Sequence, residues 1–169
     1  ALTWLLHLRQ LEPSAGPSLV VCPTSVVHNW LREAERFAPG LRVLVLERGE
    51  EREARRRELA GYGLAITSYA LLRRDVEAWR DVLLHAVILD EGQFVKNPDA
   101  GVSRAVRAIS ARHRLVLTGT PLENRPLDLW SLMEFANPGY LGTRKSFVAR
   151  FERAEAPAHG DGLERHEDE

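Results

Sequence analysis

The sequence is short of several features that would each point to a class of protein. Cys22 is the only cysteine, which excludes a disulfide within the chain and suits a reducing compartment. No apolar run approaches the roughly 20 residues that a membrane-spanning helix needs, so we expect no membrane partner and a cytoplasmic location, in a bacterial nucleoid rather than a nucleus. The six histidines show no paired spacing and there is no Cys-x-x-Cys motif, so a zinc site is not expected.

Neither sign of charge is in excess. The chain carries 23 Lys and Arg against 24 Asp and Glu, which gives a formal net charge of −1. It therefore lacks the overall basic field that draws many proteins to nucleic acid. Any nucleic-acid site must be local.

The chain of 169 residues, 44% of them hydrophobic, is about the size of one domain, and strand and helix patterns alternate along it. Short β-branched, apolar runs predict five buried strands, at residues 18–22, 42–46, 63–67, 86–90 and 114–118. Amphipathic patterns predict helices between them, at residues 2–11, 25–37, 49–59, 68–79, 101–111 and 123–135. This alternation predicts an α/β fold with a mostly parallel sheet and helices on both faces.

The end of the chain has a different composition. Residues 154–169 are acidic, with few apolar residues and several helix breakers. We expect a domain over 1–153, followed by a poorly ordered tail or the start of a linker.

Polar or small residues follow four of the five predicted strands. The sequences at these points are CPTS, ITSY, LDEGQ and LTGTP. Ligands of parallel α/β sheets bind at the carboxyl ends of the strands. The chemistry of this chain is therefore expected at one edge of the sheet.

Asp90 and Glu91 form the most informative of these strand ends. Two adjacent carboxylates there can hold a hydrated Mg²⁺ and orient a water beside a nucleotide triphosphate, and the cation offsets their mutual repulsion. The alternative is that Asp-Glu-Gly merely opens a loop, with Asp90 as a turn or cap residue. The pair alone does not decide between these interpretations.

The order of the motifs favours the first interpretation. Along the chain come CPTSVVHNW, ITSYALL, LDEGQFVKNP and LTGTPLEN followed by DLWSLMEFANPG. From about Leu2 to Phe151 this series resembles the Swi2/Snf2 family of DNA-translocating ATPases in helicase superfamily 2. Each part has a plainer explanation when taken singly, such as a helix cap at Thr24 and Ser25. The joint occurrence of four motifs in family order carries the resemblance.

The resemblance implies a RecA-like first lobe and, for the parent protein, Mg²⁺-dependent ATP hydrolysis coupled to tracking along double-stranded DNA. Asp90 would then bind Mg²⁺ through water and Glu91 would polarise the hydrolytic water. Gln93 would link the nucleotide to the neighbouring motif. Gly92 stands where the family commonly has alanine.

The resemblance also assigns the other strand ends. It implies DNA-backbone contacts for Pro23, Thr24, Ser25, Thr67, Ser68 and Tyr69, with Asn29 and Trp30 completing the first of these motifs. It implies coupling between nucleotide state and DNA contact for Lys96, Asn97, Thr118, Gly119 and Thr120.

The sequence departs from the family at its start. Members carry a Gly-rich loop ending in Gly-Lys-Thr directly before the helix that begins here at Ala1, and this sequence has no such loop. We therefore expect an incomplete first lobe that does not hydrolyse ATP alone and whose partner is the second RecA-like lobe of the parent chain. The alternatives are a degenerate lobe that binds DNA or protein without catalysis, and a purely structural interaction module.

The same departure bears on the last predicted strand. In RecA-like sheets the strand that carries the phosphate loop lies beside the strand expected here at residues 114–118. We therefore expect an apolar, unpaired sheet edge at this strand, open to self-association by strand addition or by exchange of the first helix.

Overall fold

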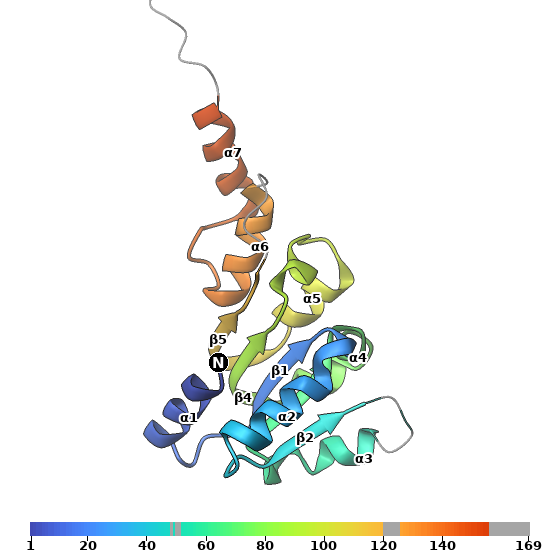
Figure 1. The fold of residues 1–169 in the computed structure, drawn as a ribbon. Coiled ribbons are helices and arrows are strands. Elements are labelled where there is room, and N and C mark those ends of the chain that lie inside the picture. Colours follow the sequence, from blue (N-terminus) through green and yellow to red (C-terminus); the bar gives the residue numbers. More distant parts are fainter. Residues whose placement is uncertain (48, 50–51, 120–125, 156–169) are drawn as a thin grey trace, which may run out of the picture.

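Five parallel strands form a single sheet in the order β2-β3-β1-β4-β5 (Figure 1). The computed structural model describes residues 1–47, 49, 52–119 and 126–155. The strands are β1 Ser18–Cys22, β2 Val43–Leu46, β3 Leu64–Ser68, β4 Leu83–Leu89 and β5 Ser110–Val116. All four strand pairings are parallel, which confirms the predicted α/β sheet. The strand order changes direction between β1 and β4, so the carboxyl ends of these neighbours form the switch point where α/β sheets bind ligands.

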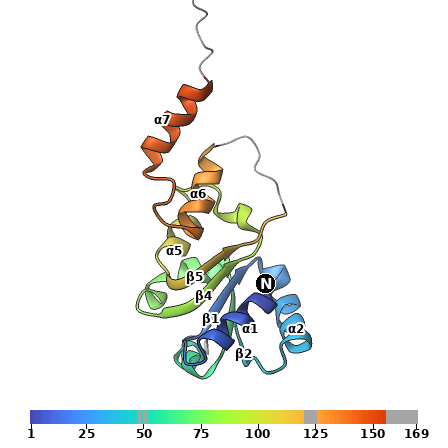
Figure 2. The ribbon, with the colours of Figure 1, turned by 90° about the vertical axis from the view of Figure 1, so that its left-hand side faces the viewer.

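Helices cover both faces of this sheet, as the sequence predicts. On one face lie α1 (Leu2–Leu11) and α2 (Val27–Phe37), and on the other lie α4 (Tyr69–Arg74), α5 (Gly101–Arg107) and α6 (Pro126–Ala136) (Figure 2). The remaining helices are α3 (Arg52–Arg57), α7 (Arg144–Glu155) and the short 3-10 helices η1 (Thr24–Val26), η2 (Leu59–Gly61), η3 (Val76–Trp79) and η4 (Gly92–Val95). Among the described residues no helix combines the length and the apolar character that crossing a membrane requires.

The central strand β1 explains why its sequence is continuously apolar. Leu19 and Val21 enter the core beneath α4, α5 and α6, whereas Val20 and Cys22 enter the core beneath α1 and α2. Every residue of β1 is buried, because both faces of the strand are covered. The expectation of a buried Cys22 is confirmed, and burial together with the charge of Asp90 raises the pKa of its thiol to about 12.

The two strands nearest one edge differ from the prediction. β4 begins at Leu83 rather than at residue 86, and β5 begins at Ser110 rather than at residue 114. The first half of β5 is polar and charged, because a strand at a sheet edge has a side open to solvent, and this hides it from a search for apolar runs. The predicted helix 101–111 therefore ends early, at Arg107.

The expected sheet edge at the last strand is confirmed in position. β5 lies at the end of the sheet, and within the described residues it pairs with β4 alone. The expectation of an apolar edge is correct only for its second half. Arg112 lies in the first half and Arg114 just beyond it, and charged residues of this kind disfavour strand addition.

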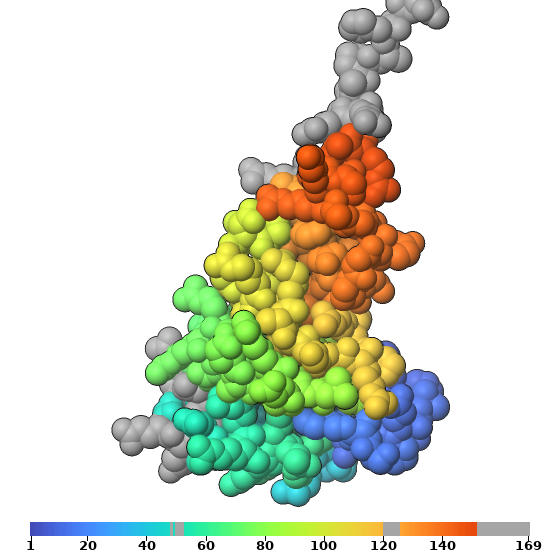
Figure 3. Space-filling model, turned by 180° about the vertical axis from the view of Figure 1, so that it is seen from behind, coloured from blue at the N-terminus to red at the C-terminus, as the bar shows by residue number. Residues whose placement is uncertain are grey.

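The α6–α7 segment extends beyond the carboxyl end of the sheet and appears orange to red in Figure 3. Phe147 of α7 is buried, and its ring packs against that of Phe151 with centroids 4.7 Å apart. Arg144 binds both carboxylate oxygens of Asp99, at 2.8 and 2.9 Å. Because α7 reaches Glu155, it continues past the expected domain end at residue 153, and the rest of the expected tail, 156–169, lies outside the described residues.

Candidate functional site

Asp90 follows β4 directly and is held in place by three neighbours. The indole N–H of Trp30 donates to its Oδ2 at 2.7 Å, and the backbone N–H of Glu91 donates to its Oδ1 at 3.0 Å. The hydroxyl of Tyr69 donates to the backbone carbonyl of Asp90 at 2.8 Å. Helix α2 thus holds the Asp90 carboxylate and α4, from the opposite face of the sheet, holds its backbone at the switch point.

Two aromatic residues of this set, Trp30 and Tyr69, make contacts with Asp90 that the sequence analysis did not predict. Trp30 has the helical spacing of a core residue, and its ring is indeed buried, but its N–H bonds to a charged group. Tyr69 is buried and stacks on Phe94, with centroids 5.1 Å apart. Burial and the nearby Asp90 charge raise the pKa of Tyr69, so its hydroxyl stays protonated and donates. Neither contact has a signal in the sequence, because Trp30 and Tyr69 lie 60 and 21 residues from Asp90.

Glu91 has a left-handed backbone conformation, with φ 55° and ψ 58°. Within the described residues it is the only residue other than glycine with positive φ. This conformation costs a residue with a Cβ roughly 1–3 kcal/mol, and such strain concentrates at functional sites. The twist turns the chain sharply out of β4 and into η4.

A hydrogen-bonded relay connects Glu91 to the end of the neighbouring strand. The Gln93 amide donates to Glu91 Oε2 at 2.7 Å, and the Thr118 hydroxyl donates to Gln93 Oε1 at 3.1 Å. Thr118 follows β5, so the two motifs expected to communicate are joined by one side chain. Gly119 is exposed beside it, and Thr120 lies outside the described residues.

Gly92 lies where no larger residue fits without movement. A Cβ at this position would meet Val116 Cγ1 at 2.5 Å and the Leu117 carbonyl at 3.3 Å. The Gly92 N–H donates to that same carbonyl at 2.8 Å. The glycine in place of the family's common alanine thus lets the loop lie directly against β5.

Below this loop, two buried serine hydroxyls lie against the Val95 carbonyl. Ser131 of α6 donates to it at 2.6 Å, and Ser103 of α5 lies 3.2 Å from it, farther than from the Asn97 carbonyl that takes its proton. Sequence reasoning did not identify either serine. Lys96 and Asn97 follow at the end of η4, where the Asn97 side chain accepts the Asp99 N–H at 2.9 Å and its carbonyl accepts the Ser103 hydroxyl at 2.6 Å.

The residues expected at DNA fall into an exposed and a buried group. Thr24 and Ser25 are exposed at the end of β1, and Pro23 before them is half-buried. Thr67 and Ser68 are buried: the Thr67 hydroxyl donates to the Leu46 carbonyl at 3.4 Å, and the Ser68 hydroxyl accepts the Leu71 N–H at the start of α4. Their contacts to DNA stay a prediction.

A pocket of about 270 Å³ brings part of both groups together. Thr24 and Ser68 both line it, with Leu46, Glu47 and Leu71. Glu47 places an acidic group there, but His28 pairs with that carboxylate at 2.9 Å. A larger hollow of about 730 Å³ lies over β2; Glu47 lines it too, but Asp90 and Glu91 do not.

The donor set at Asp90 and Glu91 fits a hydrated Mg²⁺. Both side chains are half-buried, so solvent reaches them, and carboxylate oxygens are the ligands that Mg²⁺ prefers. Each Asp90 oxygen accepts one hydrogen bond from the protein, and a carboxylate oxygen has room for a second. Asp90 can therefore accept a further hydrogen bond from a metal-bound water.

Another group of side chains has the composition of a metal site. Among the described residues, Glu12, His85 and His113 are the one set of three such side chains whose ligand atoms converge, within 4.8 Å of one another. They come from three segments distant in sequence, which explains why histidine spacing gave no signal. Burial lowers the pKa of His85.

Comparison with known proteins identifies the family. A family model described as the SNF2-related domain matches residues 1–167. The chain belongs to the SNF2-related domain family. The expected resemblance to Swi2/Snf2 proteins is thereby confirmed, and so is the RecA-like fold.

Relatives of the SNF2-related family come from several branches of life. The chain is 41% identical to TATA-binding protein-associated factor MOT1 of Saccharomyces cerevisiae over 144 residues, which are 85% of this chain and 8% of that protein. It is 38% identical to the putative ATP-dependent helicase/translocase YwqA of Bacillus subtilis over 153 residues, 89% of this chain and 16% of that one. The chain therefore spans a small part of the curated relatives it matches.

A solved SNF2 structure matches the fold closely. The Sulfolobus solfataricus SWI2/SNF2 ATPase core in complex with double-stranded DNA superposes with a TM-score of 0.74 and 40% sequence identity. The match covers 83% of this chain and 29% of that one.

Proposed function

We propose that this chain is part of an ATP-dependent motor that translocates along double-stranded DNA or remodels complexes on it. The observation that carries the proposal is the relay from Glu91 through Gln93 to Thr118, at the ends of β4 and β5 in a SNF2-family chain. It connects a carboxylate suited to nucleotide hydrolysis with the strand end assigned to coupling. The relatives named as ATP-dependent helicases support the same conclusion.

At the nucleotide, the two carboxylates have different roles. Asp90, fixed by Trp30 and by the Glu91 N–H, holds the hydration shell of Mg²⁺, which neutralises phosphate charge when bound. Glu91 accepts a proton from the attacking water and orients it. Its Oε2 is bound to Gln93, so a change of charge or contact at Glu91 shifts the relay and is felt at Thr118.

At the DNA, the exposed hydroxyls at the end of β1 are the first contacts. Thr24 and Ser25 are placed to bind phosphate oxygens, as hydroxyl side chains commonly do in DNA complexes. Thr67, Ser68 and Tyr69 form the adjoining strand end, and their hydroxyls reach DNA only if local contacts rearrange. Backbone contacts of this kind imply little sequence preference.

The 169-residue chain by itself is expected to bind duplex DNA weakly. Its net charge is −1, and few hydroxyl contacts are available. Affinity should lie in the non-specific range, roughly 10⁻⁴ to 10⁻⁶ M, and should fall as salt rises. The second RecA-like lobe would complete the DNA groove. Tight binding that does not weaken as salt rises would show that the DNA site does not lie at these hydroxyls.

The deciding experiment measures ATP turnover by the complete protein that contains this chain, with and without duplex DNA. We expect turnover to rise when duplex DNA is added. An ATP turnover rate that does not change when DNA is added would contradict the proposed motor function. DNA binding without ATP turnover would instead support a non-catalytic DNA-binding lobe.

A further inference from the structure

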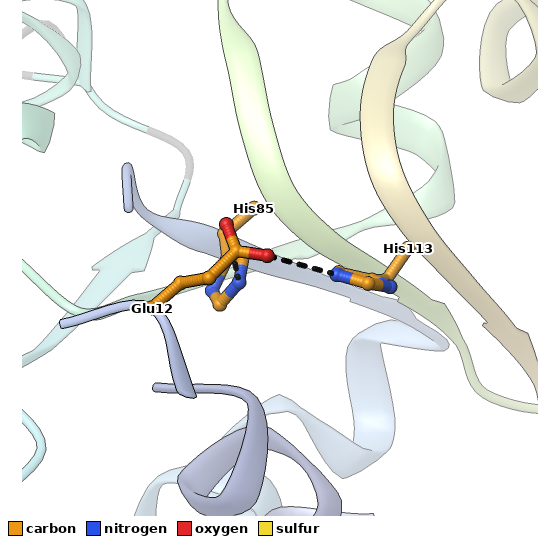
Figure 4. A group of neighbouring side chains, drawn as sticks. All are labelled: Glu12, His85 and His113. Atoms are coloured by element: carbon orange, nitrogen blue, oxygen red, sulfur yellow. Dashed lines mark ion pairs between the residues drawn. The ribbon is translucent and has the colours of Figure 1, made fainter. Parts of the chain in front are cut away.

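Three side chains meet at the amino end of the sheet, away from Asp90 and Glu91. Glu12 follows α1, His85 lies near the start of β4 and His113 lies in β5 (Figure 4). Glu12 Oε2 is 3.9 Å from His85 Nε2, and Glu12 Oε1 is 3.9 Å from His113 Nε2. The carboxylate thus lies between two imidazoles, and both rings direct Nε2 toward it.

The buried histidine lacks a hydrogen-bond partner for one ring nitrogen. His85 is 2% exposed, and within the described residues its Nε2 is the only buried side-chain nitrogen or oxygen without a partner. Most buried polar atoms find a partner, because leaving one unpaired costs its full desolvation penalty. The unpaired Nε2 faces the Glu12 carboxylate, and with the His113 ring it places three potential ligand atoms within 4.8 Å of one another.

The donor set indicates which ligand. Two imidazole nitrogens and one carboxylate oxygen, with room for water, are the three-ligand set of many zinc sites. Imidazole also suits the neighbouring divalent transition metals, whereas Mg²⁺ and Ca²⁺ prefer oxygen ligands alone.

The distances are compatible after a small movement. Zinc–ligand bonds of about 2.0–2.2 Å in tetrahedral geometry separate ligand atoms by roughly 3.3–3.5 Å. Here the ligand atoms lie within 4.8 Å of one another, with two pairs at 3.9 Å. Glu12 and His113 are partly exposed and can rotate inward, while His85 is fixed by burial.

We propose that Glu12, His85 and His113 form a binding site for a divalent transition metal, with Zn²⁺ as the best-fitting ion. The site joins the end of α1 to β4 and β5. Histidine spacing along the sequence gives no sign of this set, because its three residues come from separate segments.

The site is independent of the proposed motor chemistry. His85 lies in β4, and Asp90, which directly follows that strand, comes five residues later, about 16 Å along the chain. Metal binding can therefore succeed or fail whether or not the chain belongs to an ATPase. Its effect falls on the attachment of α1 to the sheet.

Two arginines oppose the metal and provide a further test. Arg112 donates to Glu12 Oε2 at 2.6 Å, and Arg9 lies close enough to disfavour a positive charge on His85. The Arg112–Glu12 pair is more than a third exposed on both sides, so it contributes little stability and is readily exchanged. Removing the Arg112 charge should therefore strengthen metal binding.

The experiment titrates the metal-free 169-residue chain with Co²⁺ and then Zn²⁺. The background carries His159→Gln and His166→Gln, which removes histidines outside the described residues. We expect one Co²⁺ to bind per chain and to give the visible absorption of a four- or five-coordinate site. Adding Zn²⁺ should displace the Co²⁺ and remove this absorption. A Zn²⁺ concentration 100-fold above Kd should raise the melting temperature by roughly 5–10 °C.

Variants separate the site from incidental binding. Glu12 and His113 are both partly exposed, so Glu12→Gln and His113→Gln should leave the fold intact. Loss of a residue that only supports a metal ligand costs roughly 10–100-fold in affinity, and each of these variants should weaken Zn²⁺ binding by at least that much. Arg112→Gln should strengthen binding. His28→Gln, which alters an exposed histidine paired with Glu47, should leave it unchanged. Absence of Co²⁺ absorption, or equal binding by all four variants, would overturn the proposal.

Discussion

The two ends of β4 differ in whether their polar side chains have hydrogen-bond partners. At the carboxyl end, Asp90 and Glu91 are engaged by donors from the chain itself, among them Trp30 and Gln93. At the amino end, His85 is buried with an unpaired Nε2. The carboxylates at the first end have protein donors, whereas among the described residues the buried nitrogen at the second end has no hydrogen-bond partner. One strand thus carries a carboxylate site bonded within the fold at one end and the proposed metal site at the other.

The largest expected effect comes from Glu91→Gln at the carboxyl end. The amide preserves the shape of the side chain but cannot accept the proton of the attacking water. We expect ATP turnover by the complete protein to fall by about 10²–10⁴-fold, while nucleotide binding remains. Glu77→Gln, at an exposed glutamate paired with Arg80, is the matched control and should not change turnover. Unchanged turnover in Glu91→Gln would remove this residue from the mechanism.

A smaller effect is expected when Asp90 loses one donor. Trp30→Phe keeps an aromatic ring but removes the N–H that binds Oδ2 at 2.7 Å. Because the acceptor is charged and half-buried, the free energy of unfolding should fall by about 1.5–3 kcal/mol in urea denaturation.

Trp130→Phe is the control for this substitution. The Trp130 indole donates to the neutral Gly142 carbonyl at 3.0 Å in an exposed position. Its loss should cost no more than about 0.5–1.5 kcal/mol. Equal losses in the two variants would mean that Trp30 stabilises the protein by packing, and that Asp90 does not depend on its N–H.

The smallest expected effect tests how closely the Asp90 loop fits β5. Gly92→Ala forces Val116 or the loop to move and should destabilise the protein by about 1–3 kcal/mol. The cost should be smaller in a Val116→Ala background, where the obstructing methyl is gone. Gly119→Ala, which has no atom within 4 Å of the added Cβ, should change stability little. An equal cost in both backgrounds would refute the contact.

Sequence patterns predicted the elements of this molecule that have a clear hydrophobic periodicity. β1 and α1 have the predicted bounds, because burial on both faces of the strand and one apolar stripe on the helix leave clear periodicities. β5 begins in residues whose charges are tolerated at an edge, so its start was missed. α7 was not predicted, because its buried surface is small and its composition is charged.

The candidate site was predictable in its motifs and unpredictable in its contacts. Asp90, Glu91 and Gln93 are adjacent in sequence, and their order carries the family signal. The Trp30 N–H, the two serines at Val95 and the group around His85 depend on residues 8–100 positions apart meeting in space. A single sequence contains no record of such meetings, which arise only when the helices pack.

Two serine hydroxyls bind the carboxylate loop to the helices beneath it. Ser131 of α6 donates to the Val95 carbonyl at 2.6 Å, and Ser103 of α5 donates its single hydroxyl proton to the Asn97 carbonyl at 2.6 Å. A force that tilts α6 pulls on Val95, and the short η4 passes the displacement to Glu91 and Gln93. Because α7 follows α6 along the chain, a movement of this segment would change the position of the carboxylate loop.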